Sequence, residues 1–205
     1  MDHDDLITHY HNIKPTAENR LNDFTTKPDD NHTLFKELTF CVFAANSSAE
    51  MGIKAVNLLE PVLHTGDEQT YKDRVHGKVR FYNVRSEYTA HNHDVITRLD
   101  QPLNEAINHH DNPRQLVEDM FKGIGWKEAS HFLRNTGHTG YCILDKHIRR
   151  HCADLNILED AERPTTHAEY TAKEQRIHRF CDKHELNVDI LDLALWSYTT
   201  GEILK

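Results

Sequence analysis

Apolar residues recur every three or four positions along most of this chain, the spacing that places them on one face of an α-helix. Residues 34–59 carry such a series, and Ser47 and Ser48 interrupt it, which predicts two helices or one bent helix. Residues 94–108 carry another series, with a break at Pro102. The pattern therefore predicts an all-α protein.

Capping residues mark two further helices near the C-terminus. Thr165 and Thr166 are suitable N-caps for a helix that reaches about His184. Asn187 is a suitable N-cap for a last helix, which is expected to end at Gly201 because glycine favours the conformation that follows a helix.

The most sharply punctuated segment lies between residues 113 and 136. Pro113 opens a helix, because proline suits the first helical position, and apolar side chains gather on one face of that helix. Gly123 and Gly125 end it, and a second helix begins almost at once and reaches Asn135. We expect a helix-hairpin-helix over about 113–136.

With 205 residues, the chain suits one globular unit made of two small helical lobes that flank a cleft. Its longest uncharged stretch, Leu38 to Ala49, is shorter than the roughly 20 residues of a membrane-spanning helix. The N-terminus is acidic and lacks the apolar core of a secretory signal, so a cytoplasmic protein is expected. The four cysteines lack CxxC spacing, which predicts reduced, packed thiols and no iron–sulfur cluster.

Acidic side chains outnumber basic ones, 33 against 24, for a formal net charge of −9. Two windows run the other way: residues 71–98 carry six basic and three acidic side chains, and residues 122–151 carry six and two. The first window is also aromatic and is expected to be helical after a turn at Gly77. A polyanion responds to the local patch that it touches, so the charge permits a DNA partner without arguing for one.

Glycines at both corners of the hairpin, Gly123 and Gly125, leave the backbone N–H groups open to an approaching anion. The second helix starts at the same place, and its N-terminus adds unpaired donors and a partial positive charge. This combination is a device for binding phosphate. For a lone Gly-x-Gly, an ordinary corner in a helical bundle is the simpler explanation.

Two side chains near the hairpin are candidates for catalysis. Lys127 lies in the first turn of the second helix, where the helix end and burial both favour the neutral amine, the form that acts as a nucleophile. Asp145 lies just ahead of a basic segment, and its carboxylate could stabilise a positive charge or move a proton. The simpler roles are a solvated lysine and a helix N-cap.

These residues resemble a known family. A glycine hairpin, then Lys127, then Asp145 followed by x-His-Ile is similar to the helix-hairpin-helix DNA glycosylase superfamily. More narrowly, the chain resembles the second, prokaryotic family of 8-oxoguanine DNA glycosylases in GIGWKEASHFLRN and ILDKHI. Further similar segments are FAANSSAEMGI, RFYNVRSEY and LALWSYTTGEILK, whereas the first thirty residues match no segment that we can place.

The resemblance implies a bifunctional enzyme that removes 8-oxoguanine from double-stranded DNA and cleaves the strand as an AP lyase. Lys127 would attack C1′ of a flipped-out nucleotide and form a Schiff base that undergoes β-elimination, while Asp145 would support charge at the sugar. Gly123 and Gly125 would bind a DNA phosphate, with a cation at the hairpin as an option. The expected protein is a nucleoid-associated monomer that requires no cofactor.

Lesion recognition is assigned to three residues. In the family that the chain resembles, the terminal lysine is implicated in recognition, and the α-carboxylate of Lys205 would accept the proton that 8-oxoguanine, unlike guanine, carries on N7. A frayed polar tail is the alternative. Trp196 and Phe81 are candidates to stack on the flipped base, and each could equally be a core residue.

Two other functions stay open. The same scaffold could remove another damaged base, or the chain could be a non-catalytic DNA-binding module that uses the hairpin only for phosphate contact. Lys127 and Asp145 together favour an enzyme, since a binding module needs neither. The seventeen histidines do not indicate a metal site, because the pair His147 and His151 lacks the glutamate of an HExxH motif.

Overall fold

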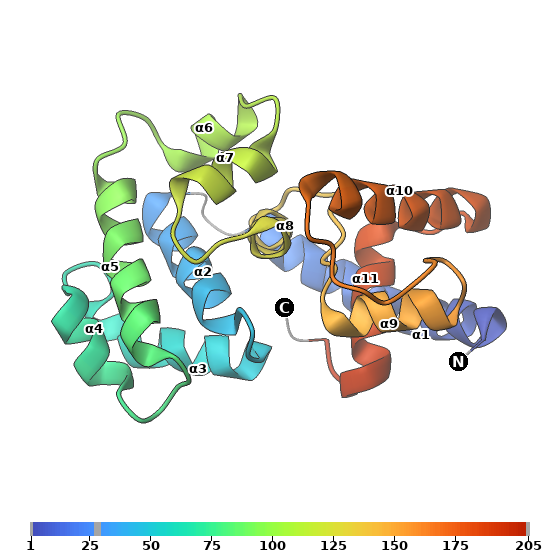
Figure 1. Ribbon diagram of the computed structural model, residues 1–205, viewed down its shortest axis with the longest axis horizontal. Helices are drawn as coiled ribbons and strands as arrows, with labels where there is room; N and C mark the ends of the chain where they lie inside the picture. The colour runs from blue at the N-terminus through green and yellow to red at the C-terminus, as the bar shows by residue number, and fades with distance from the viewer. Residues whose placement is uncertain (1, 27–29, 204–205) are drawn as a thin grey trace. The chain divides into compact units, whose positions relative to one another are not determined.

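The computed structural model describes residues 2–26 and 30–203. Within these ranges the chain forms helices and no strand, which confirms the all-α prediction. The helices are α1 (His3–Thr25), α2 (Asn31–Ala44), α3 (Ala49–Leu59), the 3₁₀ helix η1 (Glu60–Val62), α4 (Glu68–Val75), α5 (Tyr82–Thr97), α6 (Leu103–Asn108), α7 (Pro113–Met120), α8 (Trp126–Asn135), α9 (Lys146–Asp154), α10 (His167–His184) and α11 (Val188–Thr200) (Figure 1). None of the helices described has both the length and the apolar character needed to cross a bilayer.

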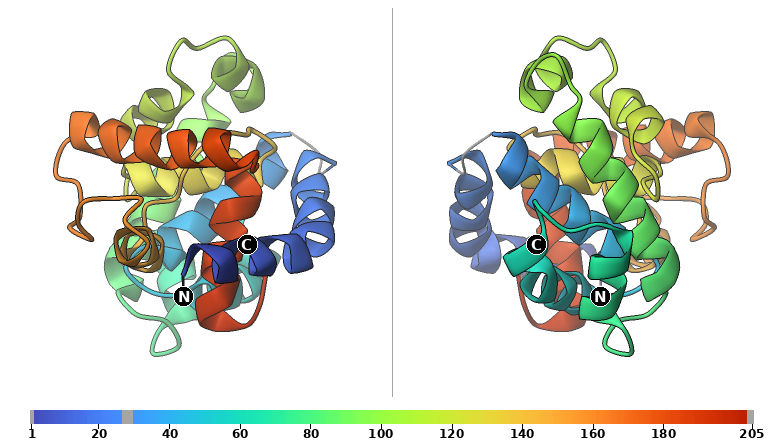
Figure 2. Two further views of the ribbon diagram at one scale, coloured as in Figure 1. Left: turned by 90° about the vertical axis from the view of Figure 1, so that its right-hand side faces the viewer. Right: turned by 90° about the vertical axis from the view of Figure 1, so that its left-hand side faces the viewer.

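The chain divides into two compact units, and unit 1 consists of Met1–Thr26 and Gly137–Lys205. Its central element is α11, which packs against α1, α9 and α10; Figure 2 (left) shows α1 and α10 crossing it. Buried side chains cover nearly all sides of α11, as expected for a helix with neighbours around it. Two of them are carboxylates, Asp189 and Asp192, and both are hydrogen-bonded to the backbone, as described below.

Unit 2 is Lys27–Thr136, and its central helix α2 packs against α3, α5, α6 and α8 (Figure 2, right). The carbonyl groups at the C-terminal end of α2 need hydrogen-bond donors. Arg85 of α5 supplies them, because its guanidinium donates to Phe43 O at 2.7 Å and to the carbonyl of Ala45. Burial lowers the pKa of Arg85, with Arg80 as a second cause, and the negative helix end stabilises its charge.

A buried carboxylate joins α2 to the end of α8. Glu37 is 5% exposed, and its Oε1 accepts a hydrogen bond from Nδ2 of Asn135 at 2.8 Å. Oδ1 of Asn135 accepts in turn from Nε of Arg134 at 3.4 Å. Because an unpaired buried carboxylate would strongly destabilise the fold, the last two residues of the sequence FLRN have a structural role in satisfying Glu37.

Several of the predicted boundaries are confirmed. Helices α2 and α3 are separate, and Ser48 caps α3 by accepting a hydrogen bond from the N–H of Met51. Thr166 and Glu169 form a reciprocal capping box at the start of α10. The sequence predicted a helix only after the turn at Gly77. The structure also has a helix before this turn, α4.

Helix α1 has no counterpart in the sequence predictions. Its buried side chains are few and widely spaced: Leu6, Tyr10, Ala17 and Phe24. Polar residues and histidines fill most other positions, so the apolar signal is weak even though its spacing is helical. Contact with α11 stabilises the helix, and it includes a hydrogen bond of 2.9 Å between His9 Nε2 and Ser197 Oγ.

Three histidines and a phenylalanine pack together in unit 2. The rings of His32 and His64 are stacked with their centroids 3.3 Å apart, and Phe35 and His93 lie beside His64. The Nε2 atom of His64 is buried and has no hydrogen-bond partner within the described ranges. Burial, followed by repulsion from His32 and His93, lowers the pKa of His64 to about 4.

The free energy of unfolding should therefore fall in acid. The pKa of His64 is about 4 in the folded state against an ordinary 6.5, so the fold favours the neutral ring. The contribution of neutral His64 to the free energy of unfolding is therefore complete above pH 6.5 and is lost as the pH falls towards 4. His64→Leu should reduce the loss of stability between about pH 7 and about pH 4.5 by about 1 kcal/mol, after allowance for solvent screening.

Urea unfolding at several pH values measures this difference. The exposed His109 provides a control, since His109→Gln should leave the pH dependence unchanged. An unaltered pH dependence in His64→Leu would contradict the assignment.

Candidate active site

The hairpin predicted over 113–136 is formed by α7, the turn at residues 121–125, and α8. Asn112 caps α7 by accepting a hydrogen bond from the N–H of Gln115 at 3.2 Å, and Pro113 occupies the first turn, as predicted. The guanidinium carbon of Arg114 lies 4.8 Å from the centre of a Trp126 ring. This contact packs the first turns of the two helices together.

Two glycines shape the turn for different reasons. Gly123 has a φ of +78°, and a Cβ atom there would lie 2.5 Å from Cδ2 of Tyr88, so backbone conformation and close packing both require glycine. Gly125, the N-cap of α8, has a φ of −104°, and a Cβ atom there would make only an ordinary contact, 3.6 Å from Oε2 of Glu128. The fold alone therefore does not require glycine at position 125, where the open backbone at a helix N-terminus suits an approaching anion.

The side chain of Asn92 holds this turn against α5. Its Nδ2 donates to Lys122 O at 3.0 Å, and its Oδ1 accepts from Lys122 N at 2.9 Å. Asn92 is 1% exposed and Lys122 is exposed, so both hydrogen bonds are partly buried. The sequence analysis assigned no role to Asn92 or Tyr88, because both lie thirty or more residues before the turn that they contact; Tyr88 ends the segment RFYNVRSEY, and Asn92 lies outside it.

Lys127 is the second residue of α8, and its side chain is partly buried, with 29% exposed. Its Nζ lies 2.8 Å from Oε1 of Glu128, a side chain that is 14% exposed. The structure therefore sets a proton acceptor directly beside the amine at the start of the helix. The sequence analysis selected Lys127 and assigned no role to its neighbour.

Phe81 immediately precedes α5 and is 51% exposed, which excludes the core role that the sequence left open for it. Its φ of +55° lies in the left-handed region, where a bulky side chain is strained. The guanidinium carbons of Arg80 and Arg85 each lie 5.1 Å from the ring centre. Arg85 also interacts electrostatically with Glu128, so Phe81 and the start of α8 belong to one region of unit 2.

Asp145 is the N-cap of α9 in unit 1. Its Oδ1 accepts hydrogen bonds from the N–H groups of His147 at 2.7 Å and Ile148 at 2.8 Å. The capping role that the sequence left open is therefore present. It uses one oxygen only, and Oδ2 accepts no hydrogen bond from residues 2–26 or 30–203, so the second oxygen remains for a ligand.

The segment that leads to Asp145 is irregular: it forms no strand pairing with the described residues, and the N–H of Asp145 donates to Ile143 O at 2.6 Å. Side chains of α10 and α11 satisfy its backbone instead: Tyr170, Glu174, Asp189 and Asp192. Asp189 accepts from Gly140 N at 3.0 Å. Asp192 accepts from Ile143 N at 3.1 Å. These carboxylates position Asp145 through the backbone that precedes it.

Trp196 lies on α11 and is partly buried, and its ring meets that of His147 edge-on with centroids 5.4 Å apart. Since the N–H of His147 is bonded to Asp145, unit 1 brings Trp196 and Asp145 into one neighbourhood. The indole Nε1 is buried and has no hydrogen-bond partner in the part of the chain that the structure describes. The remaining predicted residue, Lys205, lies outside the described residues.

All four cysteines are buried free thiols, as predicted: Cys41, Cys142, Cys152 and Cys181. Burial raises the pKa of Cys181 to about 12, and it holds the pKa of Cys142 well above its ordinary value. Because the thiolate is the reactive form, neither thiol is suited to be a nucleophile.

Comparison with known proteins decides the family. The family model described as 8-oxoguanine DNA glycosylase matches residues 17–186. This chain belongs to the 8-oxoguanine DNA glycosylase family. Among its relatives in this family, the 8-oxoguanine DNA glycosylase/AP lyase of Picrophilus torridus is 34% identical over 206 residues, which cover 98% of this chain and 96% of that protein. The resemblance seen from the hairpin to Asp145 is thereby confirmed, and it extends along nearly the whole chain.

Solved structures of the family share the fold. The 8-oxoguanine DNA glycosylase of Thermotoga maritima matches with a TM-score of 0.89 and 28% identity, over 98% of this chain and 97% of that one. A second match is the 8-oxoguanine glycosylase/lyase of Methanocaldococcus jannaschii in complex with a 15mer DNA containing 8-oxoguanine. Its TM-score is 0.85 and its identity 28%, over 98% of this chain and 99% of that one.

Loss of the Asn92 side chain should loosen the hairpin. Asn92→Ala leaves the backbone N–H and C=O of Lys122 without their partners, which should lower the free energy of unfolding by about 2 kcal/mol. Amide hydrogen exchange over residues 121–126 should accelerate more than it does elsewhere in unit 2. The matched control is His91→Ala, which alters the exposed neighbour on the same helix. If amide hydrogen exchange at the hairpin were as slow in Asn92→Ala as in the wild type, Asn92 would not hold the turn as described.

Proposed function

We infer that this protein removes 8-oxoguanine from double-stranded DNA and cleaves the strand at the resulting abasic site. The observation that carries this inference is the amine of Lys127, placed at the start of α8 beside an open hairpin backbone, in a chain of this family. A module that only binds DNA needs the hairpin but no partly buried amine beside it. Glycosylase and lyase activity both appear in the name of the Picrophilus torridus relative.

The proposed reaction begins at Lys127. The amine must lose a proton before it acts as a nucleophile, and the Glu128 carboxylate at 2.8 Å is placed to accept it. The amine attacks C1′ of the flipped-out nucleotide, and the bond from C1′ to the damaged base breaks. Opening of the sugar ring gives the Schiff base. Loss of a proton from C2′ then breaks the bond between C3′ and its phosphate oxygen, which cleaves the strand.

Asp145 has the second role in this proposal. Positive charge develops on the sugar as the base departs, and a carboxylate with one uncommitted oxygen stabilises such charge. Replacement by asparagine keeps the N-cap and removes the negative charge, so the two roles are separable. Phe81 and Trp196 supply aromatic rings for stacking on the extrahelical base. Lys205 remains a proposed residue for recognition of the lesion.

The hairpin turn supplies the DNA contact. Backbone N–H groups at Gly123 and Gly125, together with the N-terminus of α8, bind a phosphate without a basic side chain. A cation at the hairpin would add to this contact, and the proposed chemistry requires no other cofactor. We propose that the protein acts as a monomer and that it works at the nucleoid, where its DNA substrate lies.

Borohydride trapping tests the nucleophile. With an 8-oxoguanine duplex, the wild-type protein should form a covalent adduct, and Lys127→Gln should form none while its excision rate falls by roughly 10³-fold or more. Lys122→Gln is the matched control, because it removes an exposed lysine of the same hairpin and should leave trapping intact. An adduct that persists in Lys127→Gln refutes the assignment.

The two hairpin glycines should respond differently to alanine. Gly125→Ala should change the free energy of unfolding by less than about 1 kcal/mol, since its Cβ has room, yet weaken duplex binding by about ten-fold, because the methyl group occupies the approach of the phosphate. Gly123→Ala should lower both stability and binding. Fluorescence anisotropy and urea unfolding measure the two effects.

Thr166→Ala is the control for Gly125→Ala. It alters the N-cap of α10, so it should lower stability without weakening binding. Wild-type DNA affinity in Gly125→Ala would overturn the proposed contact.

A further inference from the structure

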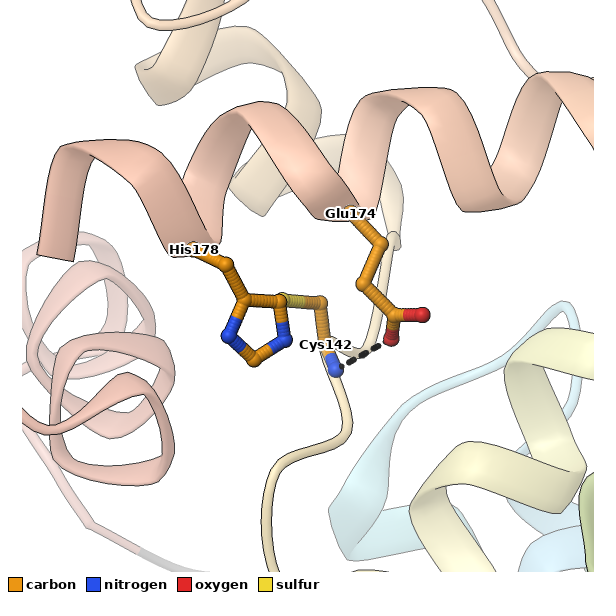
Figure 3. A group of neighbouring side chains, drawn as sticks. All are labelled: Cys142, Glu174 and His178. Atoms are coloured by element: carbon orange, nitrogen blue, oxygen red, sulfur yellow. Dashed lines mark hydrogen bonds between the residues drawn. The ribbon is translucent and has the colours of Figure 1, made fainter. Parts of the chain in front are cut away.

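A thiol, a carboxylate and an imidazole converge in unit 1. Cys142 lies in the irregular segment before α9, and Glu174 and His178 lie one turn apart on α10. One ligand atom from each lies within 4.8 Å of the other two. Figure 3 shows that both side chains of α10 leave the same face of the helix and point towards Cys142.

Hydrogen bonds to the backbone orient this group. Oε1 of Glu174 accepts from the N–H of Cys142 at 2.9 Å, which holds the carboxylate beside the residue that carries the thiol (Figure 3). His178 Nε2 lies 3.1 Å from the carbonyl oxygen of Gly140, which sets the direction of the imidazole ring. Nε2 must give up this hydrogen bond to bind an ion, because a ring nitrogen that donates a proton cannot be a metal ligand. Cys142 is 1% exposed, whereas the other two residues are partly exposed, which gives an ion a route from solvent.

The chemistry of these ligands selects a metal. Thiolate and imidazole with one carboxylate are ligands of Zn²⁺, which takes three protein ligands and a water molecule in open tetrahedral sites. Hard cations such as Mg²⁺ prefer oxygen ligands alone. Zinc–ligand bonds of about 2.0–2.3 Å separate neighbouring ligand atoms by about 3.3–3.8 Å, so ligand atoms that now lie within 4.8 Å of one another need to approach by up to about 1.5 Å.

The charge of the surroundings also favours a cation. Glu174 contributes a carboxylate, and Asp192 interacts electrostatically with Cys142 from α11. The carboxylate of Asp192 accepts from Ile143 N, the residue next to Cys142, at 3.1 Å. A divalent ion that binds a thiolate here offsets negative charge that the fold has already brought together.

We propose that Cys142, Glu174 and His178 form a binding site for one Zn²⁺ ion. The site is formed within unit 1 and uses none of the residues assigned to the reaction, and it departs from the expectation that the chain carries no metal. Bound zinc fastens the irregular segment before α9 to α10, three residues before Asp145. If the proposed function holds, the ion also positions that carboxylate, although binding itself does not depend on the function.

Metal binding by the intact protein tests the site. The protein is stripped with a chelator and titrated with Zn²⁺ against a chromophoric competitor. One tight equivalent per chain is expected, and Cys142→Ser and His178→Gln should each weaken it by about 100-fold or more. Cys41→Ser is the matched control, since Cys41 is a buried thiol of unit 2 and should have no effect.

Co²⁺ in place of Zn²⁺ gives an independent readout. The wild-type protein should develop a thiolate-to-cobalt charge-transfer absorption, which Cys142→Ser should lose and His178→Gln should retain only at much higher Co²⁺ concentration. Circular dichroism confirms that each variant is folded. Absence of a tight equivalent in the wild type, or equal Zn²⁺ affinity in folded Cys142→Ser, overturns the proposal. Neither result bears on the borohydride test of Lys127.

Discussion

A turn that offers its N–H groups to a ligand cannot also use them to hold itself in place. In this protein the restraint comes from behind the turn: the Asn92 side chain makes two hydrogen bonds to the backbone of Lys122, and the Tyr88 ring packs closely against Gly123. Both residues lie on α5, which is itself fixed to α2 by the guanidinium of Arg85. The position of Lys127 at the start of α8 therefore depends on α5, a helix that supplies no nucleophile.

Unit 1 solves a similar problem with carboxylates. The irregular segment from Gly140 to Asp145 pairs with no strand in the described ranges, so most of its N–H groups need side-chain acceptors. Asp189 and Asp192 supply them from α11, and both are almost completely buried, at 2% and 6% exposed. These two acidic side chains are therefore buried and have a structural role.

Features that the fold itself does not need coincide with the proposed DNA contacts. Gly125 has an ordinary φ and room for a Cβ atom, yet it is glycine. Phe81 is exposed, strained and flanked by two guanidinium groups, although burial would be the favourable state of a phenylalanine. Both features fall at positions where the proposed function has DNA contacts. Gly123 and Glu37, by contrast, are explained completely by packing and hydrogen bonding.

The sequence alone determined the elements whose signals are local. Caps, helix breaks and the glycine hairpin are set by residues within a few positions of one another, and the amine of Lys127 and the carboxylate of Asp145 stand in recognisable motifs. Tertiary structure decided everything that depends on distant partners: the helix α1, whose stability comes from α11; the clamp by Asn92; the ion pair of Lys127 with Glu128; and the exposure of Phe81. Periodicity records which face of a helix is buried, but not what that face meets. A hydrogen bond between residues thirty or more positions apart leaves no pattern in either segment.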